Sequence, residues 1–222
     1  MIEAVIFDMD GVLIDSEETW SRVRAAVVAR HGGRWTEQDQ RNVMGDNSRQ
    51  WSAYIVRTWN LTVDPQEVFR EVLEAMIESY AQGLAVLPGA AEAVAWLGEH
   101  YPLAVASSSP RELIPVALRG AGFGESFPVV VSSDEVERGK PEPDVYLLAA
   151  RRLGVPPGRC LALEDSSNGI RAALAAGMPT IAVPTPAFPP APEVLARAML
   201  VLPSLEELTP ELVAALATSP AP

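Results

Sequence analysis

The sequence predicts an α/β fold, in which a parallel β-sheet is flanked by helices and a helical domain is inserted near the start of the chain. Short apolar runs rich in β-branched residues recur along the chain, and such runs are typical of buried strands. Segments with the apolar spacing of helices separate the later runs, which favours parallel strands joined by crossover helices. A long helical interval interrupts this alternation soon after the first run and indicates an insertion.

Six segments have the character of strands, and four segments between them have the character of helices. The expected strands are 5–7, 103–106, 129–131, 161–163, 181–183 and 200–202. The expected helices are 89–99, 111–119, 145–153 and 168–176. Gly177 follows the last of these helices and Pro179 lies just beyond it, a combination typical of a helix C-terminus. Each helix has a strand before and after it, as a parallel sheet requires.

The interval 16–84 is helical in pattern throughout. Its apolar residues follow helical spacing, for example Trp51 and Ile55, and it holds four of the five tryptophans. We expect these residues to form a helical cap with its own core, on an α/β core made of residues 1–15 and 85–222. Because the insertion leaves the sheet directly after the first strand, the cap should cover that strand end as a lid, and lids exclude water and select substrates.

Composition and charge narrow the class of protein. The 222 residues carry a formal net charge of −12, which argues against binding to nucleic acid or to an anionic membrane, since both need basic patches. No stretch approaches the apolar length of a membrane span, and the N-terminus lacks the basic start of a signal peptide. Cys160 is the only cysteine, so an intrachain disulfide is impossible. We expect a cytoplasmic protein, a monomer or weak homodimer, that acts on a small molecule.

The first strand ends in two carboxylates separated by one residue, Asp8 and Asp10, followed by Gly11. If the extended backbone continues through them, both side chains leave the same face, because side chains along a strand repeat every two residues. Gly11 permits a sharp turn after them. Open α/β sheets bind ligands at the carboxyl ends of their strands, so the two aspartates are candidates for a metal-assisted catalytic site. The alternative is an Asp-x-Asp pair in a solvated turn.

A second acidic pair, Glu164 and Asp165, follows the strand expected at 161–163. Two such pairs at strand ends would repel one another, by roughly 4 kcal/mol for two unit charges 4 Å apart at an effective dielectric constant near 20. A divalent cation would relieve this repulsion. The chain has only two histidines, and ligation by oxygen alone favours Mg²⁺ over Zn²⁺. The candidate metal ligands are therefore Asp8, Asp10, Glu164 and Asp165.

Two further segments carry polar groups suited to a phosphate. Ser107, Ser108 and Ser109 follow a strand and precede a helix, where hydroxyls and helix N-terminal amides can bind phosphate oxygens. Simple helix capping would explain these serines equally well. Lys140 precedes Pro141, and a second proline follows two residues later. Because proline restricts the backbone, this setting predicts a positioned cation instead of a freely moving surface lysine.

Taken in order, these segments resemble the four motifs of the haloacid dehalogenase superfamily. The segments are Asp8-Met9-Asp10-Gly11-Val12-Leu13, Ser107, Lys140-Pro141 and Glu164-Asp165. The resemblance runs from Val5 to Val183 and points to the phosphoglycolate phosphatase-like and β-phosphoglucomutase-like branch. It implies a Rossmann-like core with an inserted helical cap. The second aspartate of the first motif implies phosphoryl transfer instead of dehalogenation.

The resemblance implies a Mg²⁺-dependent phosphatase that hydrolyses a small phosphomonoester, such as a sugar, polyol or glycolate phosphate. Asp8 would be the nucleophile that forms an aspartyl-phosphate, and Asp10 would be the general acid and base. Ser107 and Lys140 would be catalytic by binding the phosphoryl oxygens. The ligands of Mg²⁺ would be Asp8, the backbone carbonyl of Asp10, Asp165 and, through water, Glu164.

Two positions bear on the choice between a phosphatase and a mutase. The mutases of this branch carry a histidine coupled to the general acid in the first cap helix, and the matching residue here is Trp20. A basic cap residue contacts a second phosphate in mutases, and Arg49 is the candidate here, although its spacing from Gly45 is one residue longer. Ser108 and Ser109 are further candidates for substrate binding. These departures favour a phosphatase, with a β-phosphoglucomutase-like sugar-phosphate mutase as the alternative.

A non-enzymatic protein is the third alternative. A phospho-receiver domain also gathers acids, a hydroxyl and a lysine around a phosphorylated aspartate, but it should lack a large cap and carry that aspartate on a later, central strand. An inert binding relative is disfavoured because Asp8, Asp10, Lys140 and Asp165 are all present.

Overall fold

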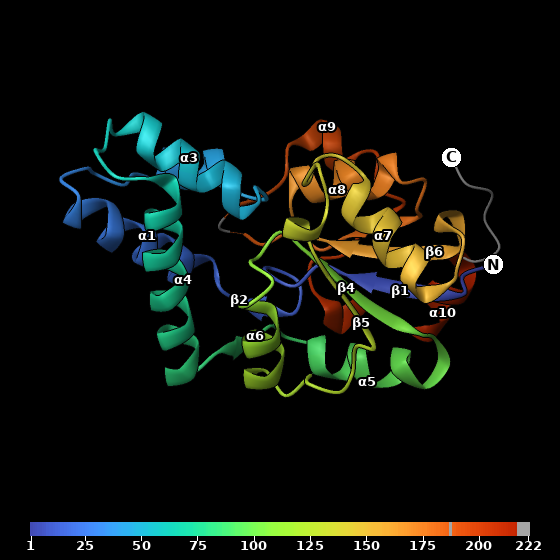
Figure 1. Cartoon of the computed structure of the whole chain (residues 1–222). Coiled ribbons are helices and arrows are strands. Elements are labelled where there is room, and N and C mark those ends of the chain that lie inside the picture. Colours follow the sequence, from blue (N-terminus) through green and yellow to red (C-terminus); the bar gives the residue numbers. More distant parts are fainter. Residues whose placement is uncertain (187, 217–222) are drawn as a thin grey trace.

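The computed structural model describes residues 1–186 and 188–216, and in this part of the chain six strands form one parallel sheet. The strands are β1 (Ala4–Phe7), β4 (Leu103–Ser107), β5 (Val129–Ser132), β6 (Cys160–Glu164), β7 (Thr180–Ala182) and β8 (Leu200–Val201). Their order is β5-β4-β1-β6-β7-β8, which places β1 between β4 and β6 (Figure 1). The expected α/β fold with a Rossmann-like parallel sheet is confirmed.

Helices cover both faces of the sheet. The main ones are α5 (Ala90–His100), α6 (Ile114–Gly120), α7 (Asp144–Leu153) and α8 (Ser167–Ala175). Val5 and Phe7 of β1 belong to the same apolar cluster as α5 and α6, whereas Ala4 and Ile6 pack with α7 and α8 on the opposite face (Figure 1). All four residues of β1 are fully buried, as expected of a parallel strand covered on both sides.

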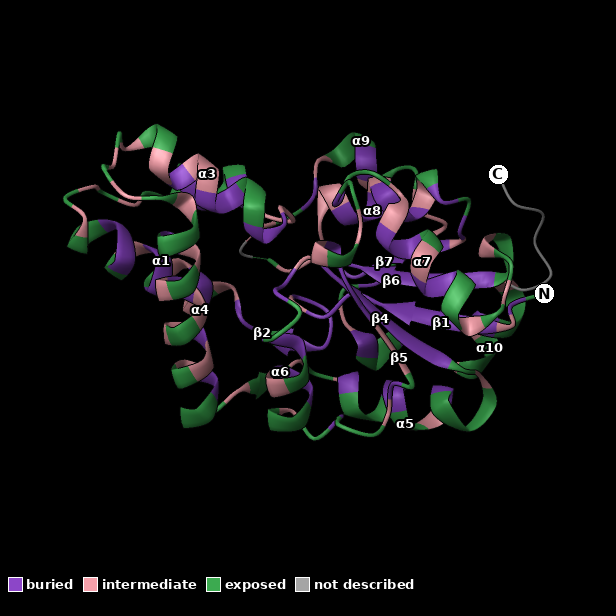
Figure 2. Ribbon diagram, viewed as in Figure 1, coloured by how far each residue is buried: buried purple, intermediate pink, exposed green. Residues whose placement is uncertain are grey.

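Four helices that follow β1 in the sequence form a bundle beside the sheet (Figure 1). They are α1 (Glu17–Arg30), α2 (Glu37–Val43), α3 (Ser48–Thr58) and α4 (Pro65–Gln82). The chain enters and leaves this bundle through an antiparallel pair, β2 (Ile14–Asp15) and β3 (Ala85–Val86). Trp51 and Ile55 of α3 and Met76 of α4 are buried, and Figure 2 shows buried stretches along these helices. We call this bundle the cap.

The structure contains short elements that the sequence pattern did not indicate. Besides β2 and β3 they are α9 (Pro192–Leu195), α10 (Pro210–Leu216) and the 3₁₀ helices Ser133–Glu135, Pro157–Arg159 and Leu205–Glu207. Elements of two to seven residues are too short to show a clear periodicity. The helix expected from Arg111 begins only at Ile114. Pro115 has no N–H to bond the carbonyl of Arg111, and in the first turn of a helix no such bond is needed.

Candidate active site

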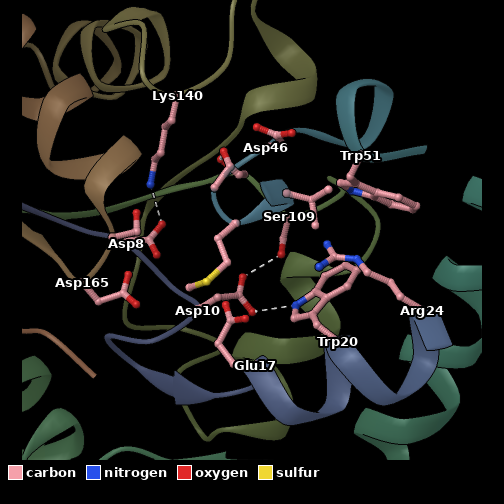
Figure 3. Close-up of a pocket in the computed structure, with 15 residues that line it drawn as sticks. Asp8, Asp10, Glu17, Trp20, Arg24, Asp46, Trp51, Ser109, Lys140 and Asp165 are labelled. Atoms are coloured by element: carbon pink, nitrogen blue, oxygen red, sulfur yellow. Dashed lines mark hydrogen bonds and ion pairs between the residues drawn. The ribbon is translucent and has the colours of Figure 1, made fainter. Parts of the chain in front are cut away.

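A cavity lies between the carboxyl ends of the central strands and the cap (Figure 3). It is lined by Asp8, Asp10, Glu17, Trp20, Arg24, Val43, Met44, Gly45, Asp46, Trp51, Ser108, Ser109, Lys140, Asp165 and Ser166. Its space for water-sized molecules is about 50 Å³. At roughly 10–15 Å³ for each water on this measure, the cavity holds only a few waters. The cap therefore closes over the strand ends.

Lys140 is buried at the base of the cavity between two carboxylates. Its Nζ lies 2.6 Å from Asp8 Oδ1 and 2.5 Å from Glu164 Oε1, and only 2% of the residue is exposed. The hydroxyl of Tyr146 on α7 also donates to Glu164 Oε1, at 2.8 Å. Burial disfavours the ammonium, but the two carboxylates outweigh this effect and raise the pKa of Lys140. The lysine is thus a fixed positive charge, as its proline-rich setting predicted.

Asp8, Glu164 and Asp165 form a buried acidic cluster. One carboxylate oxygen of each lies within 4.8 Å of those of the other two. Burial raises the pKa of Asp8 to about 8, and burial with the neighbouring carboxylates raises the pKa of Asp165 well above its usual range. One lysine cannot neutralise three carboxylates. The donor set, buried carboxylate oxygen atoms held close together, fits a hard divalent cation.

Two glycines make room for this cluster. A Cβ on Gly11 would lie 2.1 Å from Asp165 Oδ2, and the φ of +82° at Gly11 is itself unfavourable for other residues. A Cβ on Gly169, in the first turn of α8, would lie 1.8 Å from Glu164 Oε1. Glu164 also accepts hydrogen bonds from the backbone amides of Asp165 and Ser166. The backbone is thus shaped to hold the carboxylates close together.

Asp10 lies on the cap side of Asp8, outside the cluster of three carboxylates (Figure 3). Its Oδ1 accepts hydrogen bonds from Ser16 Oγ at 2.5 Å and from Trp20 Nε1 at 3.2 Å. Its Oδ2 accepts one from Ser109 Oγ at 2.7 Å, and the hydroxyl of Tyr80 stands 3.5 Å from Oδ1. Donors from both the core and the cap therefore fix the orientation of this carboxylate.

The three serines after β4 face in different directions. Ser107 is 1% exposed, and its Oγ accepts a hydrogen bond from the backbone N–H of Ser109 at 3.0 Å. Ser108 and Ser109 line the cavity, whereas Ser107 does not. Ser108 Oγ donates to the carbonyl of Gly45 in the cap at 2.7 Å. The structure thus brings two of the three serines to the cavity wall and places Ser107 behind them.

The wall on the cap side is built by α1 and by the chain around Asp46 (Figure 3). The guanidinium of Arg24 lies over the ring of Trp20, 4.5 Å from its centroid, and 5.3 Å from that of Trp51. Trp20 and Arg24 are four residues apart on α1, so they share one face of the helix. Glu17, two turns before Arg24 on α1, also lines this wall.

The site arrangement agrees with the comparison to known protein families. The family model for the haloacid dehalogenase-like hydrolases matches residues 2–177. This range includes all four sequence motifs. The chain belongs to the haloacid dehalogenase-like hydrolases. The suspected superfamily is thereby confirmed.

Similar members of this hydrolase family include proteins with assigned activities. The chain is 37% identical to hexitol phosphatase B of Escherichia coli K12 over 214 residues, which are 94% of this chain and 95% of that protein. It is 32% identical to the fructose-1-phosphate phosphatase YqaB of the same strain over 179 residues, 81% of this chain and 95% of that protein. Relatives that match most of this chain are thus named as phosphatases.

Solved structures of the family have the same fold. The crystal structure of CbbY from Rhodobacter sphaeroides in complex with phosphate has a TM-score of 0.85 and 33% identity, and the match covers 94% of this chain and 96% of that one. A β-phosphoglucomutase from Clostridium difficile has a TM-score of 0.86 at 23% identity, covering 97% of each chain. The second match shows that this chain has the same fold as a protein named as a β-phosphoglucomutase.

Several residues that shape the site of this hydrolase were not predicted. Arg24, Glu17 and Asp46 line the cavity, and Tyr146 contacts Glu164 from α7. The one available signal was the helical spacing that places Arg24 on the same face as Trp20. Arg49, expected to bind substrate, is exposed on α3 and does not line the cavity. A contact between Arg49 and substrate therefore stays a prediction.

The loop between α2 and α3, together with Ser48 at the start of α3, fastens the cap of this hydrolase to its core by three hydrogen bonds. They join Asn168 Nδ2 to Met44 O (3.1 Å), Ser108 Oγ to Gly45 O (2.7 Å) and Ser48 Oγ to Asp134 Oδ2 (3.0 Å). The loop also fits the core closely, since a Cβ on Gly45 would lie 3.0 Å from the Cβ of Asn168. The structure is thus that of a closed cap.

Proposed function

We propose that this protein is a Mg²⁺-dependent phosphatase that hydrolyses a small phosphomonoester, such as a sugar, polyol or glycolate phosphate, through an aspartyl-phosphate. The observation that carries the proposal is the pairing of two aspartates in one cavity. Asp8 lies against Lys140 and the acidic cluster, while Asp10 faces the cap and is held by hydroxyl and indole donors. One carboxylate can attack phosphorus while the other serves the leaving group.

The relatives support this substrate class. The names hexitol phosphatase and fructose-1-phosphate phosphatase describe hydrolysis of phosphate esters of a polyol and of a sugar. The small cavity is consistent with the same class, because a protein or nucleic-acid segment would need a much larger opening of the cap than a metabolite would. We therefore place sugar and polyol phosphates ahead of glycolate phosphate.

In the first step, an oxygen of Asp8 attacks phosphorus in line with the ester oxygen. A bond forms between the carboxylate and phosphorus as the ester bond breaks, and protonated Asp10 gives its proton to the leaving alkoxide. In the second step, Asp10 takes a proton from water, and the resulting hydroxide displaces Asp8 from phosphorus. The proton balance closes because Asp10 regains in the second step the proton that it lost in the first.

Lys140 restrains Asp8 and carries a positive charge beside the developing phosphoryl charge. Ser107 does not line the cavity in the closed structure. Its proposed contact with a phosphoryl oxygen would therefore require a small shift of the loop that carries it. Ser108 and Ser109 line the cavity directly and are proposed to bind substrate. Fixed hydrogen-bond donors would thus stabilise the charge-dispersed transition state of phosphoryl transfer.

Asp8, Asp165 and Glu164 would hold Mg²⁺ with the backbone carbonyl of Asp10. The buried carboxylates fit the ion because Lys140 alone cannot neutralise all three, and the raised pKa values of Asp8 and Asp165 agree with this excess of negative charge. When bound, Mg²⁺ neutralises phosphoryl oxygens and keeps Asp8 ionised. The remaining chemistry depends on the side chains described above.

We propose that residues 16–84 act as a lid that opens for substrate entry. The closed cavity has room for only a few waters, while a hexose phosphate is several times larger. Opening must break the hydrogen bonds that Met44, Gly45 and Ser48 make with the core, and also the one from Trp20 to Asp10. Product release would need the same motion.

A mutase is not favoured. Trp20 occupies the place of the mutase histidine, and its indole N–H can donate to Asp10 but cannot accept a proton. Asp10 would then be available to activate water as soon as the phosphoenzyme has formed, which leads to hydrolysis.

We further propose that the protein acts in the cytoplasm as a monomer or weak homodimer. In the described part of the chain, no helix is both long enough and apolar enough to cross a membrane. The predicted oligomeric state can be checked by sedimentation at several protein concentrations.

The experiment that tests the proposed function is a phosphate-release assay over a panel of sugar, polyol and glycolate phosphates. We expect turnover with Mg²⁺, none after treatment with EDTA, recovery when Mg²⁺ is added back, and poor replacement by Ca²⁺, whose coordination is larger and looser. Full turnover in EDTA, or no release from any phosphomonoester, would contradict the proposal.

A further inference from the structure

Arg24 is a buried cation that the phosphatase mechanism does not use. The residue is 6% exposed, yet no carboxylate of the described residues lies within 4.0 Å of its guanidinium, and its Nε has no hydrogen-bond partner. Its one hydrogen bond runs from Nη1 to Gln40 Oε1 at 3.3 Å. Burying an unpaired guanidinium is costly, and hydrogen bonds from a ligand in the cavity to its remaining N–H groups would offset this cost.

The position of Arg24 is fixed by aromatic stacking. Its guanidinium lies over Trp20 and near Trp51, and both rings are buried. Trp20 and Trp51 pack edge to face with centroids 6.2 Å apart. Such contacts hold a planar guanidinium in one orientation and leave its edge for hydrogen bonds. The side chain reaches toward the cavity from the cap side in Figure 3.

Two carboxylates lie in the same wall. Glu17 and Asp46 line the cavity with Arg24, and both are electrostatically close enough to affect its ionisation. Gln40 links two members of this group, because its Nε2 donates to Glu17 Oε2 at 2.9 Å while its Oε1 accepts from Arg24. The wall therefore offers fixed donors beside fixed acceptors.

This mixture of groups decides the chemistry of the ligand. A second phosphate or a carboxylate would gain from Arg24 but would be repelled by Glu17 and Asp46, and by Asp10 below them. A hydroxyl both donates and accepts, so neighbouring hydroxyls can bond to the guanidinium and to the carboxylates at once. An apolar alcohol would leave all of these groups unpaired.

We propose that Arg24, with Glu17 and Asp46, recognises the hydroxyl groups of the leaving alcohol, so that the substrate is the phosphate ester of a neutral polyol or sugar. The inference rests on the proposed phosphatase function and narrows it. Arg24 is then the residue that selects substrate, and glycolate phosphate and sugar bisphosphates are poor substrates.

The test compares three substrates: a hexitol phosphate, phosphoglycolate and para-nitrophenyl phosphate, whose leaving group has no alkyl hydroxyls. Arg24→Met removes the guanidinium and keeps an apolar stem for the tryptophan rings. We expect kcat/KM for the hexitol phosphate to fall about 10- to 100-fold, mainly through KM, the range for losing hydrogen bonds from a charged group. With para-nitrophenyl phosphate the change should stay below about threefold.

Arg22→Met is the matched control, because Arg22 lies on the same helix but is exposed and does not line the cavity. It should leave kcat/KM unchanged for all three substrates. Arg24→Lys keeps the charge without the planar fork and should lose most of the preference for the hexitol phosphate as well. If Arg24→Met fails to fold, as judged by its melting transition, Arg24→Lys supplies the same comparison.

Asp46→Asn distinguishes hydroxyl recognition from anion recognition. Removing this negative charge should raise kcat/KM for phosphoglycolate relative to the hexitol phosphate. An equal loss on all three substrates in Arg24→Met, or a wild-type enzyme that prefers phosphoglycolate and loses this preference in Arg24→Met, would overturn the inference while leaving the phosphatase function intact. If wild-type protein hydrolyses none of the three, the proposed function fails first, and the inference fails with it.

Discussion

The indole nitrogen of Trp20 donates a hydrogen bond to Asp10 Oδ1 across 3.2 Å, which joins the first cap helix to the carboxylate proposed as general acid and base. The same indole ring carries the guanidinium of Arg24 on its face. A residue of the cap thus touches both the proposed acid and the proposed selector of substrate. Closure of the cap would complete this arrangement, and its opening would remove a donor from Asp10.

The first prediction concerns this hydrogen bond. Trp20→Phe removes the N–H but keeps a ring to pack against Trp51 and Arg24. We expect kcat to fall about 3- to 10-fold. The loss should be smaller than if Trp20 were the sole hydrogen-bond donor to the Asp10 carboxylate, because Ser16 and Ser109 still donate to it. Steady-state kinetics with the best substrate of the panel measure the effect. Trp96→Phe, a tryptophan on α5 away from the cavity, is the control and should leave kcat unchanged.

The second prediction separates the roles of the two aspartates. Asp8→Asn should abolish measurable turnover, because it removes the nucleophile. Asp10→Asn should fold and bind metal but lose about 100- to 10,000-fold in rate, the usual range for general acid–base catalysis. Asp64→Asn is a suitable control, since Asp64 caps α4 far along the chain from the site and asparagine caps a helix equally well. Mass spectrometry of acid-quenched enzyme should find phosphate on Asp8, and phosphate on another residue would overturn the assignment.

The third prediction concerns the contact between the cap and the core. Gly45→Ala puts a methyl group 3.0 Å from Asn168 Cβ, in a loop held to the core by hydrogen bonds at Met44 and Gly45. We expect KM to rise several-fold and stability to fall by about 1–2 kcal/mol. Gly32→Ala is the matched control, because Gly32 has φ +82°, close to the +79° of Gly45, but open space around it.

The difference in KM and in stability between Gly45→Ala and Gly32→Ala measures the effect of the contact between the loop and the core. Both substitutions carry the cost of a positive φ, but only Gly45→Ala crowds the core. Thermal or denaturant unfolding measures stability, and the substrate panel measures KM. Equal effects of the two variants on KM would show that the fit between the loop and Asn168 does not matter for substrate binding.

The fourth prediction concerns Asp46 and pH. Burial raises the pKa of Asp46 to about 6, and Arg24 partly opposes this effect. The folded state therefore binds the proton more tightly than the unfolded chain, whose aspartate titrates near 3.8. Ionised Asp46 thus costs stability above pH 6, and this cost disappears as the pH falls below about 4.

Asp46→Asn should accordingly be more stable than the wild type at pH 7.5. The full pKa shift corresponds to roughly 3 kcal/mol, but Asp46 is only partly buried, so we expect about 1 kcal/mol. The advantage should shrink by about half at pH 5. Urea unfolding of both proteins at the two pH values measures it, and an advantage that is the same at both would contradict the raised pKa.

The residues at the strand ends could be predicted from sequence, whereas the cap side of the site could not. Asp8, Lys140 and Asp165 follow strands of a parallel sheet, and the carboxyl ends of such strands meet at one edge. Their approach is therefore implied by the order of strands and motifs. The pairing of Lys140 with Glu164 as well as Asp8 needed coordinates, because it depends on the path of the chain through the proline-rich turn.

The cap residues depend on how the inserted helices dock. Helical spacing places Trp20 and Arg24 on one face of α1, but it cannot show whether that face turns toward the bundle or the sheet. In the structure the same face does both, because Trp20 packs on Trp51 and also reaches Asp10. For the same reason the family resemblance could offer only Arg49 as a basic cap residue, whereas Arg24 is the cap arginine that lines the cavity.

The fifth prediction distinguishes a phosphatase from a mutase. A mutase must keep its aspartyl-phosphate from water while a bisphosphate intermediate reorients, so its acid–base residue has to be withheld from water. Here Trp20 can only donate to Asp10, and it cannot exchange a proton with it. Asp10 is then free to activate water as soon as phosphate has reached Asp8, and the phosphoenzyme should be short-lived. Incubation with β-glucose 1-phosphate and catalytic glucose 1,6-bisphosphate should release inorganic phosphate at most, with little glucose 6-phosphate.

Asp8→Asn is the control for this incubation and should give neither product. Efficient formation of glucose 6-phosphate without phosphate release would show that the enzyme protects its phosphoenzyme from water by another group. Arg49 would then be the first residue to test, because an exposed cap arginine could bind the second phosphate of a bisphosphate only if the cap closed further than it does here. With the indole of Trp20 held against Asp10 in the closed cap, we expect hydrolysis to prevail.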